Sequence, residues 1–344
     1  MVLSERRARI LALIIDDYVD SAQPVGSQAL VQRHNLPLSS ATVRNEMQAL
    51  EIEGFITHPH TSAGRIPSNR GYRYYVGSLM REKPLSAEER ARILHQFHQA
   101  ARRIEEWTSL AATVLARALG NTALVTEPRL REVFFKNMQL VELGERRALL
   151  VVVTADAAVH QRVIEFDESV DQESLTLLAN RLNVELRGRR WHEIPAPQVR
   201  PGDQLSVEAA VLAELTDLLR SLEREGLDDI VVEGVREMLR QPEFEDSDRV
   251  LDTLAAVEGR ELRRALPVES LAPESVAVVI GDENREGPYQ EMSFVLARYG
   301  VEGGVAGIVG VLGPTRMAYA DTVAHVRYIR DVLTQLIRTF YGGD

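Results

Sequence analysis

The spacing of hydrophobic residues predicts helices at the start of the chain. Ile10, Leu13 and Ile14 fall on one face of a first helix, because residues three and four apart are neighbours on a helix surface. That helix must end before Pro24, since a proline disfavours the helical conformation of the residue that precedes it. A short second helix is expected over residues 26–34, and the two helices open the first predicted domain.

A third helix is expected to begin at Ser39 or Ser40, because a serine hydroxyl can cap the free backbone N–H groups of a first helical turn. Val43, Met47 and Leu50 follow at spacings of four and three residues. This spacing places the three side chains on one face. We therefore expect that face to point into the domain core.

Gly54 is well placed to stop the third helix. The next segment, residues 56–67, contains two prolines and a glycine, which give a loop a defined shape. Three short helices followed by such a loop are the layout of a winged helix-turn-helix, whose third helix enters the major groove of DNA. The pattern therefore predicts a DNA-binding domain over residues 1–82.

The hydrophobic pattern changes again after Lys83-Pro84. Strand-like segments, rich in β-branched residues, come before and after a leucine-rich helical block, which suggests one α+β domain interrupted by an insertion. The predicted elements are a long helix from the capping box at Ser86 to Gly120, three antiparallel strands within 132–166, helices within 170–265, strands at 275–281, 291–299 and 304–312, and a final helix over about 316–340.

Composition excludes several classes of protein. A chain of 344 residues corresponds to two or three domains at roughly 150 residues each. It has no cysteine, which excludes disulfides, a catalytic thiol and cysteine-ligated zinc. It has no apolar run of the about 18 residues that a membrane helix needs. These features fit a cytoplasmic protein that does not enter a membrane.

The distribution of charge along the chain supports DNA binding better than the net charge of the whole chain does. The net charge is −11, but residues 22–81 hold six arginines and only three acids, all glutamates, a local charge of +3 that leaves −14 for the remainder. A basic module on an acidic body is compatible with nucleic-acid binding.

The outward face of the third helix carries residue types that read DNA bases. Ser40, Arg44 and Gln48 share that face at a spacing of four residues, and Thr42 and Asn45 flank them. Arginine can pair with guanine, and asparagine or glutamine with adenine, through two hydrogen bonds each. Hydroxyls and Arg65 in the following loop suit contacts to phosphate or to the minor groove. The predicted DNA-binding residues are Ser40, Thr42, Arg44, Asn45, Gln48, His60, Thr61, Ser62, Arg65, Arg70 and Arg73.

Other kinds of site have weaker support. His58 and His60 lack an obvious third metal ligand, so a loop role is favoured and no metal is expected. The glycines within 303–314 lack the lysine and Ser/Thr of a phosphate-binding P-loop, which favours tight turns and close packing. Glu283, Asn284, Thr315 and Arg316 are interpreted as residues that hold this loop or a domain junction in place.

Two functions are alternatives to a DNA-binding regulator without a small-molecule effector: an enzyme, and a regulator that such an effector switches. An enzyme is disfavoured because the chain has no nucleophile elbow, no HExxH motif and no nucleotide fingerprint; no catalytic residue and no cofactor are expected. A regulator switched by a small effector stays open, and it requires a pocket with convergent polar groups.

Two long motifs resemble the HrcA family of heat-inducible transcription repressors. The first motif is LSSATVRNEMQALEIEGFITHPHTSAGRIPSNRGYRYYV, and the second comprises IGDENREGPYQEMSFVLARYG and GIVGVLGPTRMAYADTVAHV. The resemblance covers roughly residues 1–165 and 235–344. It is most specific at the strings PHTSAGRIP and GPTRM.

The resemblance implies a multidomain α+β protein. It implies a winged helix-turn-helix DNA-binding domain at 1–82, a GAF-like domain in two segments at 83–169 and 266–344, and an inserted dimerisation domain at 170–265. It also implies a homodimer that binds an inverted-repeat operator upstream of chaperone operons and leaves it on heat stress. A GroEL-type chaperonin is implied as the partner that keeps the repressor active.

Overall fold

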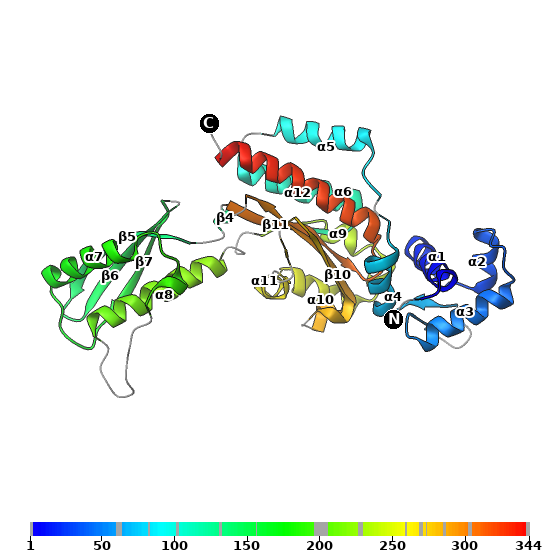
Figure 1. Cartoon of the computed structure of the whole chain (residues 1–344), viewed down its shortest axis with the longest axis horizontal. Coiled ribbons are helices and arrows are strands. Elements are labelled where there is room, and N and C mark those ends of the chain that lie inside the picture. The colour runs from blue at the N-terminus through cyan, green and yellow to red at the C-terminus, as the bar shows by residue number, and fades with distance from the viewer. Residues whose placement is uncertain are drawn as a thin grey trace. The chain divides into compact units, whose positions relative to one another are not determined.

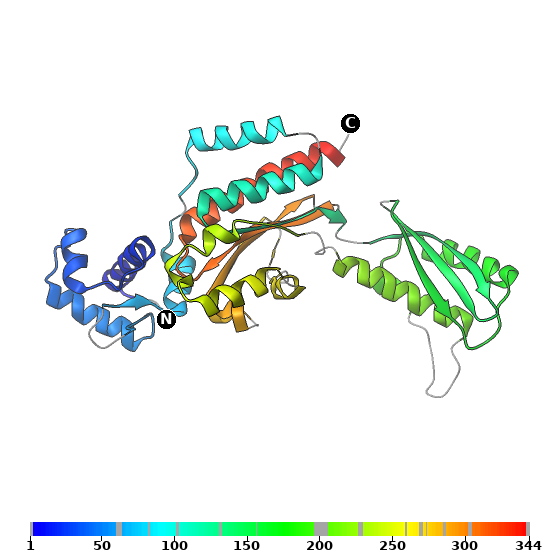
Figure 2. The same ribbon diagram turned by 180° about the vertical axis from the view of Figure 1, so that it is seen from behind.

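The protein is an α+β structure that divides into two compact units (Figures 1 and 2). The first unit comprises residues 1–127, 229–300 and 307–344, and the second comprises residues 128–228 and 301–306. The computed structural model describes residues 3–59, 64–81, 83–100, 103–130, 133–155, 157–195, 206–225, 230–258, 260–267, 271–272, 274–284, 287–301 and 305–341.

The first unit begins with the three helices and the hairpin that the sequence predicts, which are confirmed. Ser4 and Ser39 cap the first and third helices by accepting hydrogen bonds from the N–H groups of Arg7 and Thr42. Gly54 has a positive φ of 76° and ends the third helix, because its N–H and that of Phe55 bond back to the last helical turn. The elements are α1 (Glu5–Ser21), α2 (Ser27–Arg33), α3 (Ser40–Ile52), β1 (Ile56–Thr57) and β2 (Ile66–Pro67).

A small core joins these elements. The side chains of Val43, Met47 and Leu50 are buried, as predicted, and lie beside buried residues of α1 and α2. The chain then forms α4 (Asn69–Tyr74) and a π-helical turn at Tyr75–Leu79. Gly71 in α4 lies so close to β1 that a Cβ there would stand 2.1 Å from the carbonyl oxygen of Phe55. This close approach seats α4 against the hairpin.

The single long helix predicted after Ser86 is wrong, because two helices occupy this stretch. They are α5 (Ala87–Gln99) and α6 (Ile104–Leu119), and the backbone of Ala100 between them is extended. Periodicity identified the apolar stripe of each helix but could not show that the stripes pack against different neighbours. Tyr328 donates a hydrogen bond to the carbonyl of Arg90 in α5, whereas α6 packs against the central sheet.

The central sheet of the first unit has the strand order β8-β3-β11-β10-β9. Helices α6 and α12 cover one face, and α10 and α11 lie on the other (Figures 1 and 2). The elements of this sheet and of the segments around it are β3 (Thr122–Thr126), β8 (Ile230–Glu233), α9 (Val235–Met238), a 3₁₀ turn at Pro242–Phe244, α10 (Ser247–Glu258), α11 (Arg260–Ala265), β9 (Val276–Ile280), 3₁₀ turns at Gly281–Glu283 and Gly287–Glu291, β10 (Met292–Gly300), β11 (Val305–Pro314) and α12 (Tyr319–Tyr341).

Glycines of β11 permit close packing, in agreement with the favoured interpretation. A Cβ at Gly310 would stand 2.3 Å from the carbonyl oxygen of Val295 in β10, and a Cβ at Gly313 would stand 2.4 Å from the side chain of Asn121. Neither space admits a side chain. Gly303 and Gly304 lie outside the described residues.

The second unit contains the three antiparallel strands predicted within 132–166, which are confirmed. Helices α7 and α8 pack on one face of this sheet through a core that includes Met138, Leu150, Leu182 and Leu215. The elements are β4 (Arg129–Leu130), which pairs with the start of β11, β5 (Phe135–Gly144), β6 (Arg147–Thr154), β7 (Val159–Glu165), α7 (Gln172–Leu186), a 3₁₀ turn at Trp191–Glu193 and α8 (Val207–Glu225).

The boundaries of the second unit differ from those expected for the inserted domain. The main segment of the second unit runs from residue 128 to residue 228, whereas the inserted domain was expected over residues 170–265. The three strands belong with α7 and α8 because their inward side chains share one core with these helices. Residues after 229 belong with the first unit because β8 pairs with β3 there.

Candidate nucleic-acid interface

The outward face of α3 is exposed to solvent at four of the five predicted positions. Ser40, Arg44, Asn45 and Gln48 are all exposed. Thr42 is only partly exposed, and its hydroxyl lies 2.8 Å from Oγ of Ser39, the residue that caps the helix. Four of the five predicted residues on α3 therefore have side chains that are accessible to solvent.

The acidic residues near this face are neutralised by arginine. Nε of Arg7 lies 3.1 Å from Oε2 of Glu46, and Nη1 of the same arginine lies 2.5 Å from Oε1 of Glu53. One side chain of α1 thus holds a carboxylate of α3 and the carboxylate of its C-terminal cap, Glu53. This pairing reduces the negative field that would otherwise repel a phosphate backbone. Sequence spacing did not reveal this role of Arg7, because the two partners lie 39 and 46 residues away.

Arg65 is held at the base of the predicted wing. Its guanidinium lies 2.7 Å from Oε2 of Glu51, and its backbone pairs with that of Val25. His58 contacts the same glutamate through Nδ1. The Nε atom of Arg65 is buried and has no hydrogen-bond partner among the described residues. Arg65 therefore links the start of β2 to α3 through Glu51.

The remaining predicted residues have different surroundings. Arg70 is exposed and lies over the ring of Phe55, 4.7 Å from its centroid. Arg73 points instead toward the central sheet, where it pairs with Glu283 and donates a hydrogen bond of 2.6 Å to the carbonyl of Val278. His60, Thr61 and Ser62 lie outside the described residues.

A second arginine joins the N-terminal helices to the rest of the first unit. Arg316 lies 2.5 Å from Oε1 of Glu243 and donates a hydrogen bond to the carbonyl of Val19 in α1. Burial by itself lowers the pKa of the Arg316 guanidinium. The hydrogen bond and the ion pair with Glu243 raise this pKa by more, so it lies above its usual value. Arg316 thus links α1 to the turn at Pro242–Phe244, in line with its interpretation as a residue that holds a loop or junction in place.

Two tyrosines add an apolar contact at this junction. The ring of Tyr72 in α4 packs on that of Tyr319 in α12, with centroids 5.7 Å apart. Burial raises the pKa of the Tyr72 hydroxyl well above its usual value. Tyr72 is therefore a core residue rather than part of the DNA-facing surface.

The structure also bears on metals and membranes. Among the described residues, no group of three or more His, Asp or Glu side chains is placed to hold a metal ion. Within the same residues, every helix is too short or too polar to cross a lipid bilayer.

The profile of the HrcA protein C terminal domain matches residues 105–323. Curated relatives called heat-inducible transcription repressor HrcA match almost the whole chain. The protein of Herpetosiphon aurantiacus is 41% identical, with 99% of this chain and 97% of the relative covered. That of Chloroflexus aurantiacus is 40% identical, with 98% and 95% covered. That of Pelotomaculum thermopropionicum is 36% identical, with 100% and 99% covered.

One solved structure shares the fold over nearly the whole length. It is described as a hypothetical protein at 2.2 Å resolution, is 23% identical, and covers 98% of both chains with a TM-score of 0.56. This similarity supports the fold of the chain and leaves its function to other observations.

Proposed function

The chain belongs to the HrcA family of heat-inducible transcription repressors, and we propose that it represses chaperone operons by binding an inverted-repeat operator as a homodimer. Such a repressor acts on the chromosome, which places it in the cytoplasm. It acts through binding, and no catalytic chemistry is involved.

The exposed face of α3 carries this proposal. In a winged helix-turn-helix the third helix lies in the major groove, and α3 presents Arg44, Asn45 and Gln48 to solvent while its acids are paired. We assign base reading to these side chains and to Ser40, with Thr42 near the helix cap. Arg65 and Arg70 are assigned to phosphate contacts, together with His60, Thr61 and Ser62. Arg73 is assigned to the junction with the central sheet.

The homodimer is proposed to form through the second unit. The face of its sheet opposite α7 and α8 carries exposed apolar side chains among polar ones. Val141, Leu149 and Val163 are directly opposed across the three strands, and the first and last of them are 41% and 51% exposed. An exposed apolar sheet surface favours association. A second copy can cover it by the same surface, because a two-fold interface is self-complementary.

Val163→Lys is expected to shift the protein from dimer to monomer, because a lysine on the apolar face would be buried against the partner without a counter-charge. Sedimentation equilibrium at micromolar concentration measures the shift. Val184→Lys is the matched control, since Val184 is 84% exposed on α7 of the same unit. Dissociation by the control alone would place the interface on the helices and overturn this assignment.

The dimer would match the symmetry of its operator. Two recognition helices reach successive major grooves when they lie about 34 Å or a multiple of it apart, so the two-fold axis of the protein coincides with that of the inverted repeat. Bound protein would exclude RNA polymerase. Heat lowers the population of folded dimer, and a GroEL-type chaperonin restores it.

Footprinting on the promoters of the organism's chaperone operons tests this function. We expect protection of both half-sites of an inverted repeat, loss of protection on heating, and a lower protein concentration for half-protection when chaperonin and ATP are present. A scrambled half-site is the control. Equal protection of the scrambled sequence would contradict specific repression, and no effect of chaperonin would remove that partner from the proposal.

A further inference from the structure

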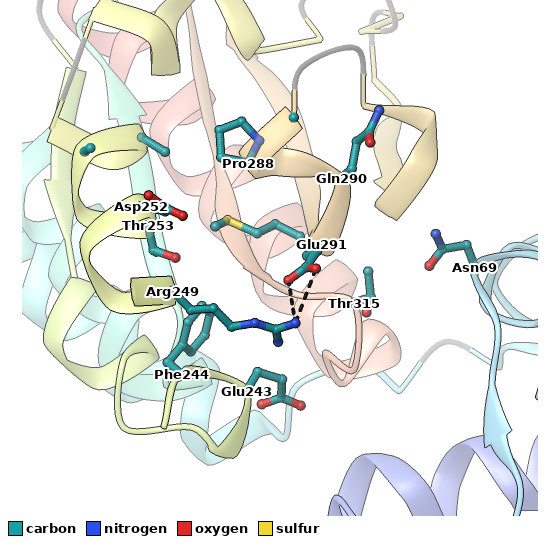
Figure 3. Close-up of a pocket in the computed structure, with 14 residues that line it drawn as sticks. Asn69, Glu243, Phe244, Arg249, Asp252, Thr253, Pro288, Gln290, Glu291 and Thr315 are labelled. Atoms are coloured by element: carbon teal, nitrogen blue, oxygen red, sulfur yellow. Dashed lines mark hydrogen bonds and ion pairs between the residues drawn. The ribbon is translucent and has the colours of Figure 1, made fainter. Parts of the chain in front are cut away.

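The first unit contains a pocket beside the junction with the N-terminal helices. Its volume is about 890 Å³. It lies between α10, the turns at Pro242–Phe244 and Gly287–Glu291, and the first residue of α4, Asn69 (Figure 3). Phe244, Ala256 and Met292 line it and are themselves buried. The pocket thus has an apolar floor large enough for a small molecule.

The hydroxyl of a largely buried threonine lines this pocket. Thr253 of α10 is only 4% exposed, and its hydroxyl turns toward the pocket (Figure 3). A threonine hydroxyl can both donate and accept a hydrogen bond. The pocket therefore offers an occupant one hydrogen bond at its floor.

The charges around the pocket favour a cation. The carboxylate of Glu243 is ion-paired with Arg316. Arg249 and Glu291 pair across the pocket at 3.4 Å (Figure 3), and both are largely exposed, so this pair is weak. Asp252 is an exposed residue that lines the same pocket, and it has no ion-pair partner among the described residues. One negative charge is therefore left uncompensated beside an apolar floor.

We propose that this pocket binds a small organic cation with an apolar body, such as an arylalkylamine. Its ammonium group would lie against Asp252, its apolar body on Phe244 and Met292, and its hydrogen bond on Thr253. Burial of the body supplies affinity, and the charge supplies selectivity over neutral and anionic molecules of the same shape.

The pocket is positioned to influence the DNA-binding helices, a consequence that rests on the proposed function. Asn69 lines the pocket and begins α4 directly after the wing. Glu243 also lines it, and its partner Arg316 holds the carbonyl of Val19 at the end of α1. An occupant that contacts either residue acts on an element of the DNA-binding module. Binding of the cation and of DNA is then coupled, and the coupling is reciprocal.

Calorimetric titration of the full-length protein with 2-phenylethylamine tests the site without DNA. We expect saturable binding at least tenfold tighter than that of 2-phenylethanol or 3-phenylpropanoate, which have similar shape but no positive charge. Asp252→Asn and Thr253→Val should each weaken amine binding several-fold. Asp282→Asn is the control, since Asp282 is exposed and does not line the pocket; it should change affinity less than twofold.

The outcomes separate this inference from the proposed function. Absence of saturable amine binding, equal binding of the alcohol, or an unchanged affinity in Asp252→Asn overturns the site, even if the operator is still bound. Normal amine binding by a protein that binds no operator overturns the function instead. Operator-bound and free protein should bind the amine with affinities that differ at least threefold, and equal affinities overturn the coupling.

Discussion

Replacing both Arg44 and Gln48 by alanine is expected to abolish specific operator binding while leaving the fold intact. Both side chains are exposed on α3, so their removal leaves no cavity in the core. Each side chain paired with a base through two hydrogen bonds contributes about 1–3 kcal/mol of discrimination. Loss of both therefore corresponds to a fall in affinity of roughly 30-fold or more. Titration of labelled operator at fixed salt, followed by fluorescence anisotropy, measures this fall.

The control for this experiment is Arg92→Ala, which removes an exposed arginine on α5, outside the N-terminal helices. Its operator affinity should stay within twofold of the unmodified protein. The double variant should lose much less affinity for a scrambled duplex than for the operator. The reason is that the substitutions remove base contacts and leave the phosphate contacts in place. Unchanged operator affinity in the double variant would sink the assignment of α3 as the recognition helix.

Arg316→Ala is expected to lower the free energy of unfolding by about 3 kcal/mol, because removal of one member of a largely buried ion pair leaves the other without compensation. The side chain of Arg316 is 12% exposed and bonds to Glu243 and to the carbonyl of Val19. Chemical denaturation measures the loss. Arg316→Lys keeps the charge but cannot reach both partners with a planar fork, so it should recover only part of the stability.

Arg220→Ala is the matched control for the loss of an ion pair. Arg220 pairs with Asp217 on the surface of α8, where exposed pairs contribute about 0–1 kcal/mol. A decrease no larger than this in Arg316→Ala would show that the junction does not depend on the arginine. If the junction also orients α1, Arg316→Ala should weaken operator binding, although Arg316 lies away from the recognition face.

Local patterns were sufficient for much of the N-terminal region. The spacing of Val43, Met47 and Leu50 identified the buried face of α3, and the serine and glycine at its ends identified its limits. The same reasoning found the three strands of the second unit and the strands β9 to β11. These features depend on residues close together in the chain, where helix and strand periodicity act directly.

Features that depend on distant partners were not predictable. The short strands β3 and β8 were missed, because each is stabilised mainly by pairing with strands far away in the sequence. Arg73 was assigned to DNA on its residue type alone, whereas the structure gives it Glu283 as a partner, 210 residues away. The pocket was also beyond reach, since its lining comes from four separate segments.

The amino-acid sequence by itself determined which residues form α3 and which side of that helix is polar, because both follow from spacing within a few turns. Only the tertiary structure decided which arginines remain available to a nucleic acid. Arg7, Arg65 and Arg73 are ion-paired, while Arg44 is exposed and Arg70 lies over an aromatic ring. The physical reason is that an ion pair forms wherever folding brings opposite charges within about 4 Å, whatever their separation along the chain.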